Sequence, residues 1–130
     1  MAHANEDLVR QAYKAFAEGD MDTLRSLIAP DGVHVATGNN PLSGEHQGVD
    51  NMLGYYGKLF ELSDGTFRAD LQSVSVEGDD TVVTTHHDSG QRNGKTLDQD
   101  ENLTFTISDG KISELSEQPD DQAAMDDFWA

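Results

Sequence analysis

The second half of the chain constrains the fold most, because it reads as four strands separated by short turns. The predicted strands cover residues 67–76, 81–89, 96–107 and 111–117. Polar and apolar residues alternate along them, which is typical of strands that bury one side. The separators EGDD, QRNG and SDG are rich in residues that favour tight turns. The sequence therefore predicts an antiparallel meander.

The first half of the chain predicts helices instead. Apolar residues recur at helical spacing within residues 5–18, 20–28 and 49–60, and a short strand is expected at 33–37. Asn5 and Asp20 are suited to cap the first two helices, and Asp121 is suited to begin a last short helix. Gly54 and Gly57 weaken the third helix, which indicates either close approach of another element or a ligand, or poor local optimisation.

This order of elements predicts an α+β fold. We expect a cone-shaped curved antiparallel sheet packed on three N-terminal helices, with an internal pocket at the open end of the cone. A length of 130 residues is typical of one domain, so we expect residues 1–130 to form a single unit.

The charge of the chain excludes two classes of partner. It has 25 acidic residues against 8 Lys and Arg, for a net charge of −17. Nucleic acid and anionic membranes are bound by basic surfaces, so neither is expected. No apolar run approaches the ~18 residues of a membrane span, and the first residues lack the pattern of a signal peptide. We expect a cytoplasmic protein.

Several kinds of chemistry have no motif in this chain. It contains no Cys, so thiolate chemistry and disulfides are excluded. The spacings typical of zinc and calcium sites, of a serine nucleophile in GxSxG and of a phosphate-binding loop are missing from the sequence. We therefore expect neither a metal ion nor a cofactor.

The dipeptide Asn93-Gly94 is the strongest short hairpin signal in the chain. A two-residue turn there places His86 opposite Glu101, and opposed residues share one side of a sheet. One side then carries Val82, Thr84, His86, Leu97, Glu101, Leu103, Phe105 and Ile107. The other side carries Val83, Thr85, His87, Asp98, Asp100, Asn102, Thr104 and Thr106.

The first of these sides points to acid/base chemistry. A His and a carboxylate paired in a partly dry pocket can exchange protons, so His86 and Glu101 are the candidate catalytic residues. The alternatives are a structural pair at the core margin and a β-bulge that reverses the facing. The second side, rich in Thr, predicts a homodimer through the sheet, and the alternative is an ordinary exposed face.

Three segments of the chain resemble a known family. The segments AYKAFAEGDMDTLRSLIAPDG, NPLSGEHQGVDNMLGYYGKLFEL and RNGKTLDQDENLTFTISDGKISELSEQPDDQAAMDDFW are similar to the SnoaL-like branch of the nuclear-transport-factor-two-like superfamily. This superfamily also holds ketosteroid isomerases, limonene epoxide hydrolases and scytalone dehydratase. The resemblance implies a cone-shaped dimer with an apolar pocket for a small, often polycyclic ligand.

The catalytic residues of the family mostly do not match. The general-base Asp of the isomerases falls at Thr37, and their oxyanion-binding Tyr falls at Ala12, beside Tyr13. Their second Asp falls at Leu103, and a slip in the alignment moves it to Glu101 or Asn102. The cyclase His corresponds to His86 or His87. The resemblance thus implies the fold, with the isomerase and cyclase sites absent or rebuilt.

The residues expected to line the pocket come from most elements of the fold. They are Tyr13, Phe16, Thr37, Tyr55, Tyr56, Thr84, Leu103, Phe105 and Glu117. Of the remaining candidates, His34 is expected to be structural and His46 to lie at the surface near the pocket mouth. Phe128 and Trp129 are expected to cap the cone or the dimer edge.

Two functions follow from this pattern. The first is a cofactor-independent isomerase, cyclase or hydrolase that acts on a small apolar ligand through His86 and Glu101, with Tyr55 or Tyr56 bonding the ligand oxygen. The second is a dimeric small-molecule binder or structural module without catalysis. Missing acids at both isomerase positions, Thr37 and Leu103, favour the second.

The dense negative charge generates a prediction about salt. Carboxylates repel one another in dilute buffer, and salt screens this repulsion. Adaptation to high salt therefore predicts that the melting temperature, followed by calorimetry, rises steeply as potassium chloride is added, whereas the favoured interpretation is an ordinary acidic cytosolic protein. That rise would indicate adaptation to high salt. A constant melting temperature up to molar salt would instead indicate an ordinary acidic cytosolic protein.

Overall fold

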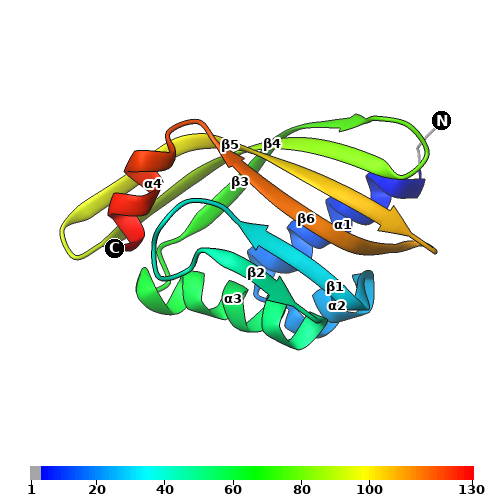
Figure 1. Cartoon of the computed structure of the whole chain (residues 1–130), viewed down its shortest axis with the longest axis horizontal. Coiled ribbons are helices and arrows are strands. Elements are labelled where there is room, and N and C mark those ends of the chain that lie inside the picture. Colours follow the sequence, from blue (N-terminus) through cyan, green and yellow to red (C-terminus); the bar gives the residue numbers. More distant parts are fainter. Residues whose placement is uncertain (1–3) are drawn as a thin grey trace.

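The computed structural model describes residues 4–130, which form four helices and six strands (Figure 1). In chain order they are α1 (Ala4–Glu18), α2 (Met21–Leu27), β1 (Ile28–Ala36), β2 (Gly44–Gln47), α3 (Val49–Leu62), β3 (Arg68–Val76), β4 (Thr81–Arg92), β5 (Lys95–Ser108), β6 (Lys111–Pro119) and α4 (Gln122–Trp129). None of the helices in these residues has the length and hydrophobicity to span a bilayer.

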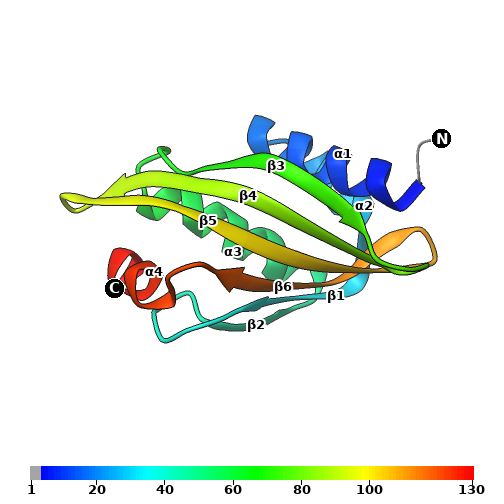
Figure 2. The same cartoon turned by 90° about the horizontal axis from the view of Figure 1, so that it is seen from above.

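The strands form one curved sheet in the order β2-β1-β6-β5-β4-β3. Helices α1, α2 and α3 lie against one face, and α4 lies at the end of the sheet near the β4–β5 hairpin (Figures 1 and 2). The predicted α+β cone is confirmed. One detail was wrong, because β1 runs parallel to β6 while the other pairs are antiparallel. The last strand of the meander, β6, pairs with β1, and β1 follows α2 directly in the chain.

Strand β1 begins earlier than the pattern indicates. It starts at Ile28 rather than Val33, and it includes Pro30 and Gly32. Its pairing with β6 shifts register between Ile28 and Val33. Proline is tolerated in a strand at such an irregularity, so its presence did not end the strand. The short edge strand β2, whose backbone pairs with β1, was not predicted from the sequence.

The helix ends follow local chemistry with one exception. The carboxylate of Asp20 accepts a hydrogen bond from the Thr23 amide at 3.1 Å and caps α2. Asp121 does the same for α4 through the Ala124 amide at 3.0 Å. Asn5 lies inside α1 rather than at its cap, and its side chain donates to the carbonyl of Asp79 at 2.8 Å.

The two glycines of α3 do not serve close packing. Gly54 and Gly57 are exposed. A methyl group added to either would meet nothing within 4 Å. Close approach of another described element is therefore excluded, whereas approach of a ligand and poor local optimisation of this helix both remain.

The β4–β5 hairpin has the register that the sequence predicts. Arg92 pairs with Lys95 across the turn, and His86 pairs with Glu101. Asn93 and Gly94 have φ values of 51° and 78°, as a type I′ turn requires at both central positions. Because the strands pair without a shift from the turn to Thr81, the facing of every residue between them follows from this turn.

The core lies between the inner face of the sheet and the helices. Val9 of α1, Met52 of α3 and Val82 of β4 are completely buried there. Phe128 and Trp129 of α4 are buried too, and the Trp129 ring packs on Phe67 with centroids 5.9 Å apart. Helix α4 thus covers the end of the cone, as expected.

Candidate functional site

A cavity of about 90 Å³ lies inside the cone. That volume holds several water molecules. Its wall is mostly apolar, with contributions from the three N-terminal helices, the sheet and α4. The apolar residues are Ala12, Phe16, Leu24, Ile28, Ala36, Leu42, Leu59, Phe67, Ala69, Leu103, Phe105, Ile112, Leu115, Met125 and Trp129.

Most of the predicted pocket residues lie in this wall. They are Tyr13, Phe16, Thr37, Tyr55, Tyr56, Leu103, Phe105 and Glu117. Thr84 is different, because it is fully buried behind the wall and its Oγ1 lies 2.7 Å from the Tyr13 hydroxyl. The two predicted catalytic residues, His86 and Glu101, also line the cavity.

Four polar residues form a buried group that we call the His86 cluster: Tyr13, His86, Asp88 and Glu101. His86 Nδ1 lies 2.6 Å from the Tyr13 hydroxyl. His86 Nε2 lies 3.2 Å from Glu101 Oε1 and 2.9 Å from Asp88 Oδ1. Both ring nitrogens of His86 are therefore held by protein groups on opposite sides of the ring.

The hairpin brings these residues together. His86 and Asp88 are two residues apart on β4, so they point to the same side of the sheet. Glu101 is directly opposite His86 on β5. Tyr13 reaches the ring from α1, whose buried face packs on the same side. Asp88 was missed by the sequence interpretation, although its spacing of two from His86 is the signal that places it here.

The carboxylates of this cluster are not fully satisfied. Both oxygens of Asp88 and Oε2 of Glu101 are buried and have no hydrogen-bond partner within residues 4–130. The short distance from Asp88 Oδ1 to His86 is an ion-pair contact without hydrogen-bond geometry. Buried polar atoms nearly always have partners, so these oxygens are suited to bind a polar group that enters the cavity.

Burial and charge shift the proton equilibria of the cluster. Burial lowers the pKa of His86, but its close contacts with the carboxylates of Asp88 and Glu101 outweigh this effect and raise that pKa to about 9. Burial raises the pKa of Glu101 well above its ordinary range, and the nearby charges of Glu117 and Asp88 add to the rise. Burial also raises the pKa of Tyr13. The cluster therefore retains protons at neutral pH that free side chains would release.

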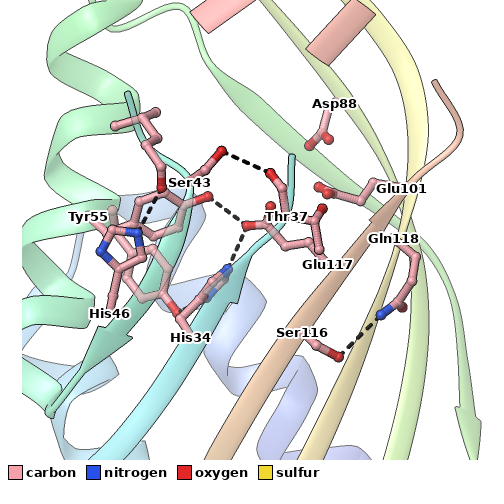
Figure 3. A network of polar contacts seen from close by, with 12 residues as sticks. His34, Thr37, Ser43, His46, Tyr55, Asp88, Glu101, Ser116, Glu117 and Gln118 are labelled. Atoms are coloured by element: carbon pink, nitrogen blue, oxygen red, sulfur yellow. Dashed lines mark hydrogen bonds and ion pairs between the residues drawn. The ribbon is translucent and has the colours of Figure 1, made fainter. Parts of the chain in front are cut away.

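A second buried polar group, which we call the His34 cluster, contains His34, Tyr55, Tyr56 and Glu117 (Figure 3). His34 Nε2 lies 2.5 Å from Glu117 Oε2, and Nδ1 lies 2.8 Å from the Tyr56 hydroxyl. The Tyr55 hydroxyl donates to the same Glu117 oxygen at 2.6 Å. His34 was expected to be structural, yet it lines the cavity on the β1 side.

His46 extends this group toward the surface. Its ring stacks on Tyr55 with centroids 4.3 Å apart and an interplanar angle of 17°. Its Nε2 lies 2.9 Å from the Leu42 carbonyl. The side chain is half-buried, outside the residues that line the cavity.

The outer face of the hairpin carries a separate charged group. His87 Nδ1 lies 2.8 Å from Asp100, and its Nε2 lies 2.6 Å from Asp98. Hydrogen bonds to these two aspartates raise the pKa of His87. As the register predicts, this group is separated from the cavity by the sheet, so it takes no part in the pocket.

The His86 cluster is also the set within the described residues that could hold a metal ion. One ligand atom from each of His86, Asp88 and Glu101 lies within 4.8 Å of the others. A cation would have to displace His86 Nε2 from Glu101, and Nδ1 is already engaged by Tyr13. The contacts that His86 makes are therefore suited to proton exchange as they stand, whereas binding of a cation would require them to change.

The positions that the family resemblance pointed to have other contacts here. Thr37, at the isomerase base position, donates to the Gln122 side chain at 2.6 Å. Leu103, at the second Asp position, contributes an apolar part of the wall. Carboxylates line the cavity instead at Asp88 on β4, at Glu101 on β5 and at Glu117 on β6.

Comparisons with known proteins identify the family. Residues 9–115 match the model of the SnoaL-like domain, and the chain belongs to this family. An uncharacterized protein of Mycobacterium tuberculosis, Rv0034, is 38% identical over 127 residues, which cover 98% of this chain and 97% of that protein. It is similar in sequence along almost its whole length.

Solved structures agree. Bal32a, from a soil-derived mobile gene cassette, superposes with a TM-score of 0.96 at 31% identity and covers 98% of this chain and 97% of its own. A Xanthomonas campestris protein of unknown function with a cystatin-like fold has a TM-score of 0.89 at 37% identity, over 95% and 96% of the two chains. The fold and family are thus established, while the reaction is a separate question.

The retained protons of the His86 cluster generate a prediction about stability. A raised pKa in the folded state means that His86 and Glu101 bind protons which the unfolded chain releases. Their contribution to stability is therefore complete on the acidic side. It declines as the pH rises above the ordinary glutamate pKa, and the part from His86 is lost between about 6.5 and about 9. Urea unfolding in high salt should show the free energy of unfolding falling over this range.

Two variants separate this effect from surface charge. The double variant His86→Gln/Glu101→Gln should flatten the dependence on pH. His87→Gln, on the outer face, should remove only the smaller part that its own raised pKa contributes. An unchanged slope in the double variant would assign the dependence to other groups.

Proposed function

We propose that the cavity binds a small apolar ligand and that the His86 cluster performs acid/base chemistry on it without a cofactor. The observation that supports this most is the set of unpartnered buried carboxylate oxygens at the wall of an otherwise apolar cavity. A functional site is where burial and neighbouring charges commonly shift pKa values, as they do here. The reaction class is that of an isomerase, cyclase or hydrolase.

The contacts suggest a different role in proton transfer for each residue of the His86 cluster. Asp88 has two oxygens free to accept a proton from the ligand. Glu101, which retains its proton, can donate through Oε2 to a ligand oxygen. His86 touches both carboxylates and carries the proton between them, while Tyr13 fixes its ring. This proposal adds Asp88 and Tyr13 to the pair of catalytic residues, His86 and Glu101, that the sequence predicts.

The apolar wall favours this chemistry. A carboxylate in water is well solvated and is a weak base toward carbon acids, whereas the same group in a dry cavity is less stabilised. Charge that develops on a ligand oxygen next to Glu101 is also more strongly stabilised where the local dielectric is low. The tyrosine that contacts His86 is Tyr13, a member of the His86 cluster, and not Tyr55 or Tyr56.

The alternative function is a non-catalytic small-molecule binder. The lack of acids at Thr37 and Leu103, the two isomerase positions, favours it. Under this alternative the carboxylate oxygens bind polar groups of a ligand, and the ligand is released without chemical change. The two functions differ in one measurable property, which is whether bound ligand exchanges protons.

Exchange of carbon-bound protons tests the two functions without knowledge of the natural substrate. We expect the protein to accelerate deuterium exchange of the α-protons of β-tetralone in D₂O, followed by NMR. Asp88→Asn, Glu101→Gln and His86→Gln should each lower the rate by a factor on the order of 10² or more, because each removes a member of the proton path. His87→Gln is the matched control and should leave the rate unchanged. Binding of β-tetralone without accelerated exchange would favour the binder.

We also propose that the protein is a cytoplasmic homodimer formed through the outer face of the sheet. Val83, Thr85, Thr104 and Thr106 are half-buried, small and uncharged, and they lie together on β4 and β5. Such a face suits self-association about a twofold axis. The lack of Cys in the chain suits a reducing compartment.

Light scattering tests the dimer. We expect a mass of twice the 14.2 kDa of the chain in high-salt buffer. The double variant Val83→Asp/Thr104→Asp should be monomeric, because it places charges on the paired surface. Gln11→Asp, on an exposed position of α1, adds charge elsewhere and should remain a dimer. A monomeric wild-type protein would contradict the proposed interface.

A further inference from the structure

The His34 cluster has no role in the proton chemistry proposed above, yet it holds one carboxylate in a fixed position. Glu117 Oε2 accepts hydrogen bonds from the Tyr55 hydroxyl and from His34 Nε2. Tyr55 approaches from α3 and His34 from β1, so the group is anchored by two different elements. His34 is itself held by the Tyr56 hydroxyl. The anchoring leaves the Glu117 carboxylate in one orientation at the cavity wall.

The second oxygen of Glu117 remains available. Oε1 makes no hydrogen bond within residues 4–130. It is also not one of the completely buried oxygens that lack a partner. A carboxylate offers about four acceptor positions, and only two are used here. An acceptor that is already oriented loses little freedom when a donor binds, so it recognises a ligand donor efficiently.

The two clusters lie next to each other on the inner face of the sheet. Leu103 pairs with Glu117, and Glu101 pairs with Pro119. Glu101 and Glu117 are therefore diagonal neighbours, with Cβ atoms separated by about 7–8 Å or slightly less. Figure 3 shows both side chains projecting from the sheet toward the side on which α3 lies. One ligand can touch both groups if its polar atoms are separated by about the width of a ring.

The rest of the wall defines the body of that ligand. Aromatic and aliphatic side chains from α1, α3 and the sheet surround the cavity, among them Phe16, Leu59 and Phe105. They favour a flat or alicyclic hydrocarbon body. The polar atoms of His34, Tyr55 and Tyr56 are already partnered within the protein, which leaves Glu117 as the polar contact on this side.

We propose that Glu117 is a second ligand-binding residue and that the ligand is a cyclic hydroxycarbonyl compound. The carbonyl oxygen lies at the His86 cluster, and a hydroxyl group donates to Glu117 Oε1. The ligand group on this side must be a hydrogen-bond donor because a carboxylate only accepts hydrogen bonds, and a hydroxyl is the uncharged donor that suits the apolar wall. This inference rests on the proposed function, because it assumes that the same cavity holds the ligand.

Calorimetric binding of matched probes tests the inference. The probes are tetralin, β-tetralone and the hydroxy derivatives of β-tetralone with the phenolic group at each ring position. We expect at least one hydroxy derivative to bind about tenfold or more tightly than β-tetralone, as one hydrogen bond to a charged acceptor provides. The advantage should be lost in Glu117→Gln, in which the amide is no longer a charged acceptor. Affinity for β-tetralone, which has no hydroxyl group to donate to Glu117, should change far less in this variant than affinity for the hydroxy derivative.

A second variant keeps the test valid if Glu117→Gln fails to fold. Tyr55→Phe removes one anchor of Glu117 and keeps the ring that stacks on His46. It should reduce the hydroxyl advantage, measured within this variant as the ratio of the affinities for the hydroxy derivative and for β-tetralone. A purely structural role would instead lower the affinity for all three kinds of probe together.

The outcomes separate this inference from the proposed function. If β-tetralone binds and exchanges protons but no hydroxy derivative binds better, the assignment of Glu117 is overturned and the proton chemistry stands. If the hydroxyl advantage survives in Glu117→Gln, the assignment is overturned as well. If none of the probes binds, the ligand-binding cavity and the role of Glu117 are both rejected.

Discussion

The two-residue turn at Asn93 and Gly94 is the constraint on which the rest of the site depends. Both residues have positive φ, which sets a type I′ turn and pairs β4 with β5 without a shift along their whole length. The pairing places His86 opposite Glu101 on the inner face and leaves His87 on the outer face. A slip of one residue would exchange the two faces, so that the buried cluster would be in solvent and the outer charged group would be in the core.

Burial of the cavity wall affects the stability of the fold in two opposite ways. Its hydrocarbon surface stabilises the fold by burial and is where α1, α3 and α4 meet the sheet. The same burial makes the unpartnered oxygens of Asp88 and Glu101 costly in the folded state. A fold retains such groups at functional sites, where a ligand supplies the missing partners. The His34 cluster shows the contrasting arrangement, in which His34, Tyr55 and Tyr56 satisfy one another and orient a single free acceptor on Glu117.

The family establishes the scaffold but not the chemistry. The chain matches the SnoaL-like domain over residues 9–115, and the structure superposes closely on Bal32a. Nevertheless Thr37 and Leu103 lack the acids of the isomerases. The carboxylates at the cavity wall lie instead at other inward-facing positions, Asp88 on β4, Glu101 on β5 and Glu117 on β6. A curved sheet tolerates this, because any inward-facing residue near the open end of the cone reaches the same enclosed space.

The sequence by itself determined the local features of this protein. The alternation of the last four strands, the caps at Asp20 and Asp121 and the turn at Asn93 depend on neighbours in the chain, so they were predictable, and with them the pairing of His86 with Glu101. Only the tertiary structure decided what joins that pair. The parallel contact of β1 with β6 brings His34 to Glu117, residues 83 apart in sequence. Packing of α1 on the sheet brings Tyr13 to His86. No local pattern encodes such contacts, because they depend on how separately formed elements bury their apolar faces together.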